Sequence, residues 1–539
     1  GILCFTITGC GDKFTKEFFK EFVDRFKKCL ENEAKYCSEN HINRKTASDY
    51  GIFDLTCKQF EKMFDSFEDK IEKIYNLTPL QEGILFHNLE EENSTSYVTQ
   101  SIFKINSGID IDLFNKALEL LSGRYDALKT AVIYQNIDNP KQVVFKNTTP
   151  ELIYVSNCDS SDLSEYINED INRGFRLDKD VLLRVTVLEL GECCEILWTI
   201  HHIITDGWCS KLMFNKLMEY YGKLLSGVSS TDIEIEIASE RFKEGEYSDY
   251  INWLEKQGTE KAKCYWRDLL CGYDNITEIK AIEKPESSCY HVKTLYGKIE
   301  CETTEKLKNI AEKNQSTIST IAEMACGIML QKYTGTEDVV FGKVVSGRNA
   351  PIANIDKIVG LFINTIPVRV LAEKDTTISE LIKMQQKQSI ESTEYDFCSL
   401  AEIQAMTKCG KDLIKLLYVF ENFDSGTERI NNNVSLEDIF DSEFEDLGSR
   451  EQTNYDITLS VYDSSGYLAF SVMYDPNKYL ENEIELLIKR YERILTEISK
   501  NIEDKVCNIK MLTSEERTLI LNEFNATEAE YPRDKTVVE

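Results

Sequence analysis

The chain has 539 residues, which is long for one hydrophobic core and, at about 150 residues per domain, corresponds to roughly three or four compact units. Hydrophobic residues make up 42% of the sequence, so a disordered or fibrous protein is excluded. With 62 basic against 93 acidic residues the net charge is −31, which repels phosphate backbones and anionic lipid surfaces and argues against nucleic-acid or membrane partners.

The first 70 residues show few elements. Residues 2–8 resemble a strand, residues 14–37 carry apolar side chains at helical spacing, and a polar linker at 38–48 precedes a short amphipathic helix at 56–70. A strand and a helix alone cannot form a domain. We therefore expect their core partners to lie before residue 1 or in the rest of the chain.

From Tyr75 onward, helices and strands mix. The expected helices lie at 79–89, 112–125 and 210–225, and the expected strands lie at 97–105, 129–134 and 142–145. The runs 182–190 and 194–200 flank Gly191-Glu192 and predict an antiparallel hairpin. An acidic, Ser-rich loop is expected after residue 225.

A second mixed unit begins near Tyr247. Its expected helices lie at 252–269, 318–334 and 481–498, and its expected strands lie at 339–345, 364–370, 416–421, 456–462 and 468–474. Two α/β lobes of similar size are the economical architecture for such an order of elements.

The 17 cysteines are an odd number, are spread along the chain and never occur as Cys-x-x-Cys, so we expect them to be reduced and mostly buried. Neither zinc-ligand spacing nor a nucleotide-binding glycine motif occurs, and no metal or nucleotide cofactor is expected. The sequence has no basic amino-terminal region followed by a long apolar run, and no uninterrupted run of about 18 apolar residues. These features predict a cytoplasmic protein.

The segment His201–Gly207, with the sequence His-His-Ile-Ile-Thr-Asp-Gly, follows the second strand of the hairpin. Only five histidines occur in the chain, so two adjacent ones at a strand end indicate a site. Because strand residues alternate faces, His201 and His202 should point to opposite sides, and only one of them can enter a pocket. The other is then structural, and strand parity does not choose between them.

The chemistry suited to this motif is acyl transfer. A neutral imidazole can accept a proton from an attacking amine or hold that amine by a hydrogen bond. Asp206 could orient the loop or make a distant ion pair, and Gly207 allows a positive φ or a close backbone approach, with its N–H available to an oxyanion. A core histidine and an ordinary glycine turn are the plain alternatives. No Gly-x-Ser-x-Gly elbow is present, so direct attack by a bound acceptor fits better than a nucleophilic triad.

The motif resembles the His-His-x-x-x-Asp-Gly signature of the condensation domains of nonribosomal peptide synthetases. Further blocks resemble those of the family and stand in the same order: Leu77–His87, Arg124–Thr130, Tyr247–Trp253, Ser346–Arg348, Gly360–Thr365, Ser399–Gln404 and Phe420–Phe423. The resemblance covers about residues 72–510. Two residues depart from the family pattern, Lys129 where a second arginine is usual and Tyr395 where a histidine is common.

The resemblance implies an α/β fold of two chloramphenicol-acetyltransferase-like lobes, residues 75–246 and 247–510, which form a V-shaped pseudo-dimer around a central tunnel. Two phosphopantetheine arms would meet in that tunnel, supplied by upstream and downstream peptidyl carrier proteins. The chain carries no Ser-containing attachment motif for such an arm, so carrier proteins are the expected partners and no covalently bound cofactor is expected.

The resemblance also implies a role for each residue of the motif. His202 would be the catalytic histidine, with Gly207 beside it. His201 and Asp206 would be structural, Asp206 through an ion pair with Arg348 of the second lobe. Further residues implied near the tunnel are Trp208, Asn364 and Thr365.

Both ends of the chain resemble neighbouring domains. Residues 1–45 are similar to the tail of an epimerisation domain, followed by a linker at 46–74, and residues 511–539 are similar to the lead into an adenylation domain. A preceding epimerisation domain implies a D-configured donor, and Pro79–Gly83 has the form found in condensation domains with that preference. The expected protein is the D-donor, L-acceptor subtype and a monomer.

The expected function is peptide-bond formation in nonribosomal peptide synthesis, the secondary metabolism that yields antibiotics. The amine of a downstream L-aminoacyl thioester would attack an upstream peptidyl or aminoacyl thioester. Two alternatives stay open. An epimerisation domain shares the histidine motif, although its Glu-Gly-His-Gly-Arg-type block is absent here. A catalytically silent module that docks carrier proteins is the alternative without an enzymatic activity.

Overall fold

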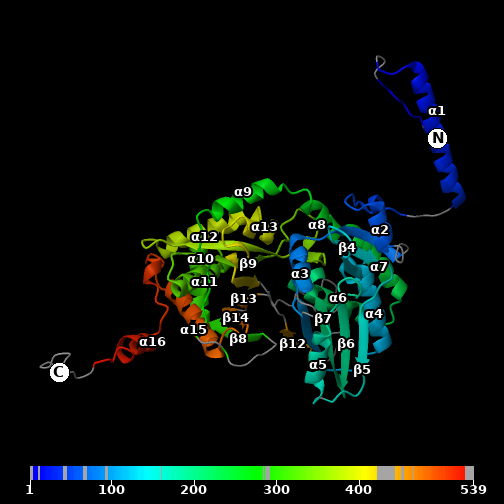
Figure 1. The fold of residues 1–539 in the computed structure, drawn as a ribbon. Coiled ribbons are helices and arrows are strands. Elements are labelled where there is room, and N and C mark those ends of the chain that lie inside the picture. Colours follow the sequence, from blue (N-terminus) through cyan, green and yellow to red (C-terminus); the bar gives the residue numbers. More distant parts are fainter. Residues whose placement is uncertain are drawn as a thin grey trace, which may run out of the picture. The chain divides into compact units, whose positions relative to one another are not determined.

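The structure is a computed structural model. It describes residues 4–9, 13–40, 45–64, 70–90, 95–159, 161–282, 285, 292–421, 444–450, 455–464 and 466–528. The chain divides into two compact units, Gly1–Ile71 and Glu72–Glu539 (Figure 1). The last part of the predicted adenylation lead-in, 529–539, lies outside the described residues, as do Asn422 and Phe423 of the last block.

In the first unit, the described residues form helix α1 (Lys16–Asn40), the 3₁₀ helix η1 (Ala47–Tyr50) and helix α2 (Cys57–Phe64). The helix predicted at 14–37 is confirmed, and it continues into the predicted linker. The strand predicted at 2–8 is wrong for the described residues 4–8, which form no strand. A strand requires a hydrogen-bonded partner, and an apolar run does not by itself provide one.

The second unit begins with a five-stranded sheet of order β12-β2-β7-β6-β5. Its strands are β2 (Val98–Ile105), β5 (Glu151–Val155), β6 (Leu183–Leu190), β7 (Cys193–His201) and β12 (Phe444–Arg450). The predicted hairpin is confirmed, with β6 and β7 antiparallel and Leu190 opposite Cys193. The edge strand β12 comes from the far end of the chain and pairs antiparallel with β2. The first sheet is therefore completed by the second half of the sequence.

Alternation along β7 divides its side chains between two faces of the sheet. Trp198 and Ile200 pack into a large core with the helices α4 (Ile111–Arg124) and α6 (Gly207–Leu225), whereas Leu197 packs on the other face against α5 (Leu163–Asn172). Successive side chains of β7 therefore lie on opposite faces of the sheet, as the sequence analysis assumes for this strand. The structure extends the predicted helix at 210–225 back to Gly207, directly after the histidine motif.

A three-stranded sheet of order β1-β4-β3 and two further helices complete this lobe. They are β1 (Ile71–Asn76), β3 (Thr130–Ile133), β4 (Lys141–Phe145), α3 (Pro79–Glu90) and α7 (Ser230–Lys243). The acidic loop predicted after residue 225 is wrong, because α7 occupies most of it. Ser229 caps this helix by accepting the N–H of Asp232, and Ile233 and Ile237 bury one side of it while the acidic residues face solvent.

The second lobe is built on a six-stranded sheet of order β10-β9-β11-β13-β14-β8. Its strands are β8 (Lys293–Ile299), β9 (Asp338–Val345), β10 (Asn364–Leu371), β11 (Leu416–Glu421), β13 (Ile457–Ser464) and β14 (Tyr467–Tyr474). The helices around it are α10 (Cys301–Lys313), α11 (Ile318–Thr334), α12 (Ile378–Thr393), α13 (Leu400–Ala405) and α15 (Glu481–Ile498), and α16 (Ser514–Thr518) follows. The strands predicted here are confirmed to within two residues at each end.

The single helix predicted at 252–269 is wrong. Two helices stand there, α8 (Tyr247–Leu254) and α9 (Thr259–Leu269), and Gly258 is the capping residue that precedes α9. Glycine disfavours a helix interior, so Gly258 separates α8, which ends at Leu254, from α9 although the apolar spacing continues across it.

Each sheet has its own hydrophobic core, one formed by residues between Leu77 and Leu361 and the other by residues between Ile279 and Ile509. Figure 1 shows β5, β6, β7 and α4 on the right of this unit and β8, β9, α10 and α11 on the left. The architecture is the mixed α/β fold of two lobes that the order of elements predicts. Within the described part of the chain, no helix is both long and apolar enough to cross a membrane.

Candidate active site

His201 ends β7 and is fully buried. Its backbone N–H donates to Leu182 O at 2.9 Å, its Nδ1 accepts the N–H of Ile203 at 3.1 Å, and its ring meets that of Phe175 edge-on, with 6.4 Å between centroids. Because Nδ1 accepts a hydrogen bond, the neutral ring carries its proton on Nε2. Burial, with a smaller contribution from neighbouring His202, lowers the pKa of His201 to about 3. The ring is therefore neutral at physiological pH.

His202 lies one residue beyond the strand, where it begins the 3₁₀ helix η4 (His202–Ile204). Its backbone N–H donates to Tyr97 O at 2.7 Å. The predicted alternation of faces does not extend to this residue, because the backbone leaves the strand at His202. His202 is buried as well but keeps 8% of its surface accessible against 0% for His201, so it is the less enclosed of the two.

Gln81 on α3 supports η4 through its side-chain amide. Its Nε2 donates to Ile203 O at 2.7 Å and lies 2.9 Å from Gln142 Oε1, and the residue is fully buried. In the sequence, Gln81 was only one of the residues of the family-like block Leu77–His87, and no role was predicted for it. A polar side chain on the apolar side of a predicted helix is the signal that could have singled it out.

Asp206 is the cap of the helix that follows the motif. Its Oδ1 accepts the backbone N–H of Cys209 at 3.2 Å, and this hydrogen bond caps the amino-terminal end of α6. From the second lobe, Phe362 donates its backbone N–H to Oδ2 at 3.2 Å, and Arg348 Nη2 lies 3.2 Å from both carboxylate oxygens. The ion pair that the family resemblance implies is thus present in the structure, between side chains that are 10% and 1% exposed.

Arg348 uses both of its amino groups. Nη1 donates to Ile355 O at 2.6 Å and to Ile358 O at 3.0 Å, while Nη2 also lies 3.1 Å from Cys209 Sγ. The guanidinium stacks 4.2 Å from the ring centroid of Phe362. A lysine has neither the fork nor the flat face for this arrangement. Burial, followed by the charge of Asp206, raises the pKa of the Cys209 thiol to about 12, so this cysteine is not a nucleophile.

Two glycines of the family-like blocks make the close packing of this junction possible. Gly347 has a φ of +64°, and a Cβ there would lie 1.8 Å from Phe362 O. A Cβ on Gly360 would lie 2.1 Å from the ring of Tyr247, whose hydroxyl donates to Leu361 O at 2.7 Å. A side chain at either position would therefore overlap these atoms unless the packing shifted.

Gly207 differs from the prediction. Its φ is not positive, and a Cβ built on it would meet no atom within 4 Å, so it serves neither a left-handed turn nor close packing within the chain. As the first residue of α6, its N–H has no partner within the helix. The space beside Gly207 is open at the turn that carries His202.

The residues expected at the tunnel differ in accessibility. Trp208 is 54% exposed, and its Nε1 donates to Asp356 O at 2.8 Å. Asn364 and Thr365 are buried at the start of β10, two residues beyond the segment that binds Asp206. The amide of Asn364 donates to the backbone oxygens of Asp396 and Cys398 at 2.7 and 2.8 Å.

Thr365 bonds to the hydroxyl of Tyr455, and burial raises the pKa of that tyrosine to about 12. Tyr455 also adds to the rise of the Tyr97 pKa that burial causes, so these two phenols lie near each other. The backbone oxygen of Tyr97 in turn accepts the backbone N–H of His202. The start of β10 is thus connected to the histidine turn through two tyrosines that the sequence did not single out.

The second block holds a network of charges around Asp126. Lys129 Nζ lies 3.1 Å from Asp126 and 2.8 Å from Glu72, and Lys73 and Arg241 lie 2.8 and 3.0 Å from the same aspartate. Burial alone would raise the pKa of Asp126, but these three cations lower it to about 2. Lys129, which departs from the family pattern, therefore still supplies the positive charge that the network requires.

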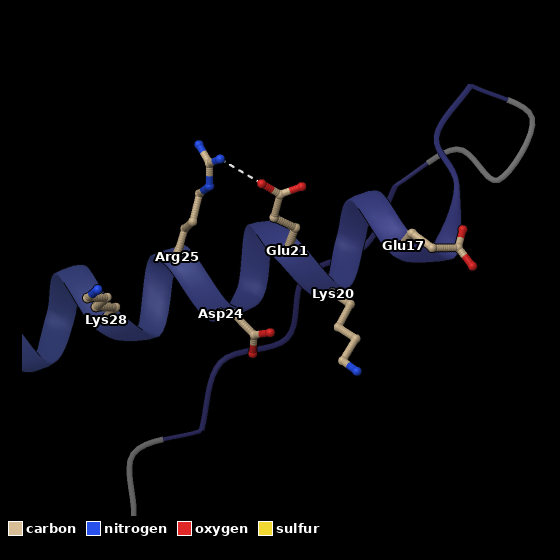
Figure 2. Close-up of a pocket in the computed structure, with 6 residues that line it drawn as sticks. All are labelled: Glu17, Lys20, Glu21, Asp24, Arg25 and Lys28. Atoms are coloured by element: carbon tan, nitrogen blue, oxygen red, sulfur yellow. Dashed lines mark hydrogen bonds and ion pairs between the residues drawn. The ribbon is translucent and has the colours of Figure 1, made fainter.

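A hollow along α1 carries charges but no such arrangement. Figure 2 shows its lining by six side chains of one helix, Glu17, Lys20, Glu21, Asp24, Arg25 and Lys28, and Arg25 Nη2 donates to Glu21 at 2.6 Å. Alternating charges four residues apart are typical of a solvated helix face. Among the residues that the structure describes, no group of three His, Cys, Asp or Glu side chains could hold a metal ion.

Known proteins resemble the chain in sequence. The family model of the condensation domain matches residues 71–521. The chain is 31% identical over 533 residues to bacitracin synthase 3 of Bacillus licheniformis, covering 97% of the chain and 8% of that protein. It is 36% identical over 480 residues to tyrocidine synthase 3 of Brevibacillus parabrevis, covering 88% of the chain and 7% of that protein. The chain thus spans only a small part of the length of these relatives.

Solved structures resemble the fold at lower sequence identity. The first condensation domain of the CDA synthetase has a TM-score of 0.60 at 16% identity, over 82% of this chain and 99% of that one. The X-domain from teicoplanin biosynthesis has a TM-score of 0.66 at 16% identity, over 81% of this chain and 97% of that one. These likenesses show the fold, the chloramphenicol-acetyltransferase-like pair of lobes. The chain therefore belongs to the condensation-domain family, the acyltransferases of nonribosomal peptide synthetases.

Proposed function

We propose that this chain joins two carrier-bound substrates by a peptide bond in nonribosomal peptide synthesis. The observation that carries the proposal is the placement of His202, the less enclosed histidine of the motif, just before a helix cap that Asp206 and Arg348 tie to the second lobe. A group at that place is held by both lobes, and a rigidly held imidazole is what proton transfer to or from a bound amine requires.

The amine nitrogen of the downstream aminoacyl thioester attacks the carbonyl carbon of the upstream thioester. A C–N bond forms, the C–S bond breaks, and the upstream phosphopantetheine leaves as a thiolate. The nitrogen loses one proton and the thiolate gains one, so the reaction needs no net proton. In this proposal His202 accepts or holds the amine proton, and the N–H of Gly207, the first residue of α6, binds the carbonyl oxygen as it becomes negative. Thioesters are activated already, so positioning supplies much of the rate.

Peptidyl carrier proteins, upstream and downstream, are the proposed partners that bring the two phosphopantetheine arms. The donor is proposed to be D-configured, on the form of Pro79–Gly83 and on the similarity of residues 1–45 to the tail of an epimerisation domain. An adenylation domain is proposed to follow residues 511–539. In this assignment Trp208, Asn364 and Thr365 lie along the path of the substrates, and residues 75–246 and 247–510 are the two lobes.

A docking module without catalysis is the second candidate. The observation that favours it is the likeness to the X-domain, whose fold has been solved in complex with the protein OxyB. An epimerisation domain is a third reading, because it shares the histidine motif. These three functions predict different outcomes with the same two substrates: a dipeptide, a racemised donor, or no product.

The test presents D- and L-aminoacyl donors on an upstream carrier protein together with a loaded acceptor carrier, and follows the dipeptide by mass spectrometry. Dipeptide from the D-donor in excess over the L-donor is the expected result. Equal yields would remove the stereochemical proposal, and racemised donor without dipeptide would favour epimerisation. Absence of both products, with carrier binding intact, would favour the docking module.

A further inference from the structure

Asp396 is a buried carboxylate at the junction that carries Arg348 and Asn364. It is 6% exposed and lies in the segment before α13. Its Oδ2 accepts the side-chain amide of Asn349 at 3.1 Å. Its backbone oxygen accepts the side-chain amide of Asn364 at 2.7 Å. One residue thus contacts the two segments that form the second lobe's side of the proposed active site.

Asn349 directly follows Arg348 in the sequence. A hydrogen bond that fixes Asn349 therefore also fixes the turn from which Arg348 reaches Asp206. The charged groups that act on the same surroundings are Arg348 from this turn and Asp206 from the cap of α6. Both also act on the phenol of Tyr250 on α8, whose pKa is raised by burial first and by the charge of Asp396 second.

The carboxylate is costly to fold at this position. Burial raises the pKa of Asp396 to about 6, although the Asn349 amide lowers it. In an unfolded chain an aspartate has a pKa of about 3.9, so between about pH 4 and pH 6 the folded state binds more protons and its stability falls as the pH rises. An asparagine has nearly the same shape and could accept the same hydrogen bond without a charge. Stability therefore does not explain the carboxylate.

We propose that Asp396 is a positioning residue for condensation, whose ionised side chain holds Asn349 and so keeps Arg348 in the arrangement that the reaction requires, while its backbone oxygen holds Asn364. The inference rests on the proposed function. A hydrogen bond to a charged oxygen is roughly twice as strong as one to a neutral oxygen. The charge on Asp396 therefore fixes the turn that carries Asn349 and Arg348. Burying the Asp396 carboxylate lowers the free energy of unfolding, and the gain is a more exact position of Arg348 in the site.

The experiment compares Asp396→Asn, Asn349→Ala and the double variant with the wild type in the dipeptide assay, with the thermal unfolding of each protein measured in parallel. Asp396→Asn should unfold at a higher temperature than the wild type at pH 7.5, yet its kcat should fall about tenfold with KM changed less than about twofold. Asn349→Ala should lower kcat by a similar factor, and the double variant should be no slower than the slower single one, because the two residues act as a pair.

Glu195 provides a matched control. It is 7% exposed, burial raises its pKa as well, and it stands on β7 six residues before His201, about 20 Å along the strand. Glu195→Gln should therefore gain stability in the same way without any loss of kcat. The ratio of wild-type to Asp396→Asn activity should also decline towards one near pH 5, where the wild-type carboxylate is protonated.

An Asp396→Asn variant with wild-type kcat at pH 7.5 would overturn the positioning role. A wild-type to variant ratio that stays constant from pH 5 to pH 8 would do so as well, as would losses from the two single variants that multiply in the double one. Absence of dipeptide from the wild type with every donor would contradict the proposed function and the positioning role together. If the wild type forms dipeptide and Asp396→Asn has the same kcat, only the positioning role is contradicted.

Discussion

At the scale of single residues, the two neighbouring imidazoles of the motif differ in the contacts that bear on proton transfer. Nδ1 of His201 accepts a backbone N–H and its ring contacts Phe175, whereas His202 begins a new turn and is less completely buried. A ring whose pKa is lowered to about 3 cannot take up a proton near neutral pH. The residue that remains for acid–base work is His202.

The burial of His201 predicts a pH-dependent stability. The unfolded ring titrates near about pH 6.5 and the folded ring near 3, so between these values the unfolded state binds more protons and stability rises with pH. Urea unfolding of the wild type from about pH 4 to pH 7 should show this rise, at no more than about 1.4 kcal/mol per pH unit. His201→Gln should flatten it. The same slope in both proteins would mean that His201 is not the buried neutral group described above.

The Asp206–Arg348 pair predicts a large loss of stability when one partner is removed. Both side chains are largely buried, so Arg348→Ala leaves an uncompensated charge at Asp206 and should lower the free energy of unfolding by about 3–5 kcal/mol. The exposed pair of Lys306 and Glu302 on α10 is the control, and Lys306→Ala should leave denaturant unfolding unchanged. A loss for Arg348→Ala that is as small as the control's would contradict the role of this pair as a tie between the lobes.

At the scale of elements, the junction depends on glycines of two kinds. Gly347 and Gly360 lie against Phe362 O and the Tyr247 ring, while the space beside Gly207 holds no atom of the described chain. Glycine thus allows close packing at positions 347 and 360 and leaves open space at position 207.

These differences predict opposite outcomes for alanine substitutions. Gly360→Ala and Gly347→Ala should lower the melting temperature markedly, with a loss of about 2 kcal/mol or more, because the new methyl group overlaps backbone or ring atoms. Gly207→Ala should keep the wild-type melting temperature, because alanine favours the first turn of a helix. It should nevertheless slow dipeptide formation. Unchanged activity in Gly207→Ala would show that no substrate approaches the backbone at that place.

The elements that the sequence predicted correctly are those whose apolar period is regular. The hairpin of β6 and β7 consists of two largely apolar runs that flank a short Gly-Glu turn, and α11 was predicted with the bounds that it has. Helix α7 was missed because two buried isoleucines are a weak signal among many acidic residues. The split between α8 and α9 was missed because apolar spacing continues across Gly258.

The site was predictable only in part for a different reason. The motif itself lies within seven residues, so its sequence is visible at once. The partner of Asp206 is 142 positions away, and only the family resemblance joined the two. Asp396, Gln81 and Tyr455 belong to no local pattern, because their importance comes from burial and from contacts between distant segments.

At the scale of the whole second unit, the two lobes share structure beyond the ion pair. Val359 and Leu361, which follow the first strands of the second lobe, are buried in the core of the first lobe. A third cluster brings together Tyr75, Tyr247 and Phe362 from both halves of the chain, and β12 completes the first sheet. Residues 72–539 accordingly form one compact unit.

This sharing predicts that the two lobes unfold together. Trp198 is fully buried in the core of the first lobe and Trp266 in a separate cluster of the second lobe, so two variants that each retain only one of the chain's four tryptophans report on each lobe separately. Their fluorescence transitions in urea should coincide within error, as a cooperative two-state unit requires. Two transitions separated in denaturant concentration would show that the shared segments do not couple the lobes.

The proposed mechanism depends above all on His202, which carries out the proton chemistry of condensation on a scaffold held by both lobes. The decisive experiment compares the rate of dipeptide formation by the wild type and by His202→Ala, with equal thermal stability confirmed beforehand. We expect the wild type to form dipeptide and the variant to be slower by about a hundredfold or more, the usual contribution of a positioned acid–base group. Dipeptide formation by His202→Ala at the wild-type rate would contradict this mechanism.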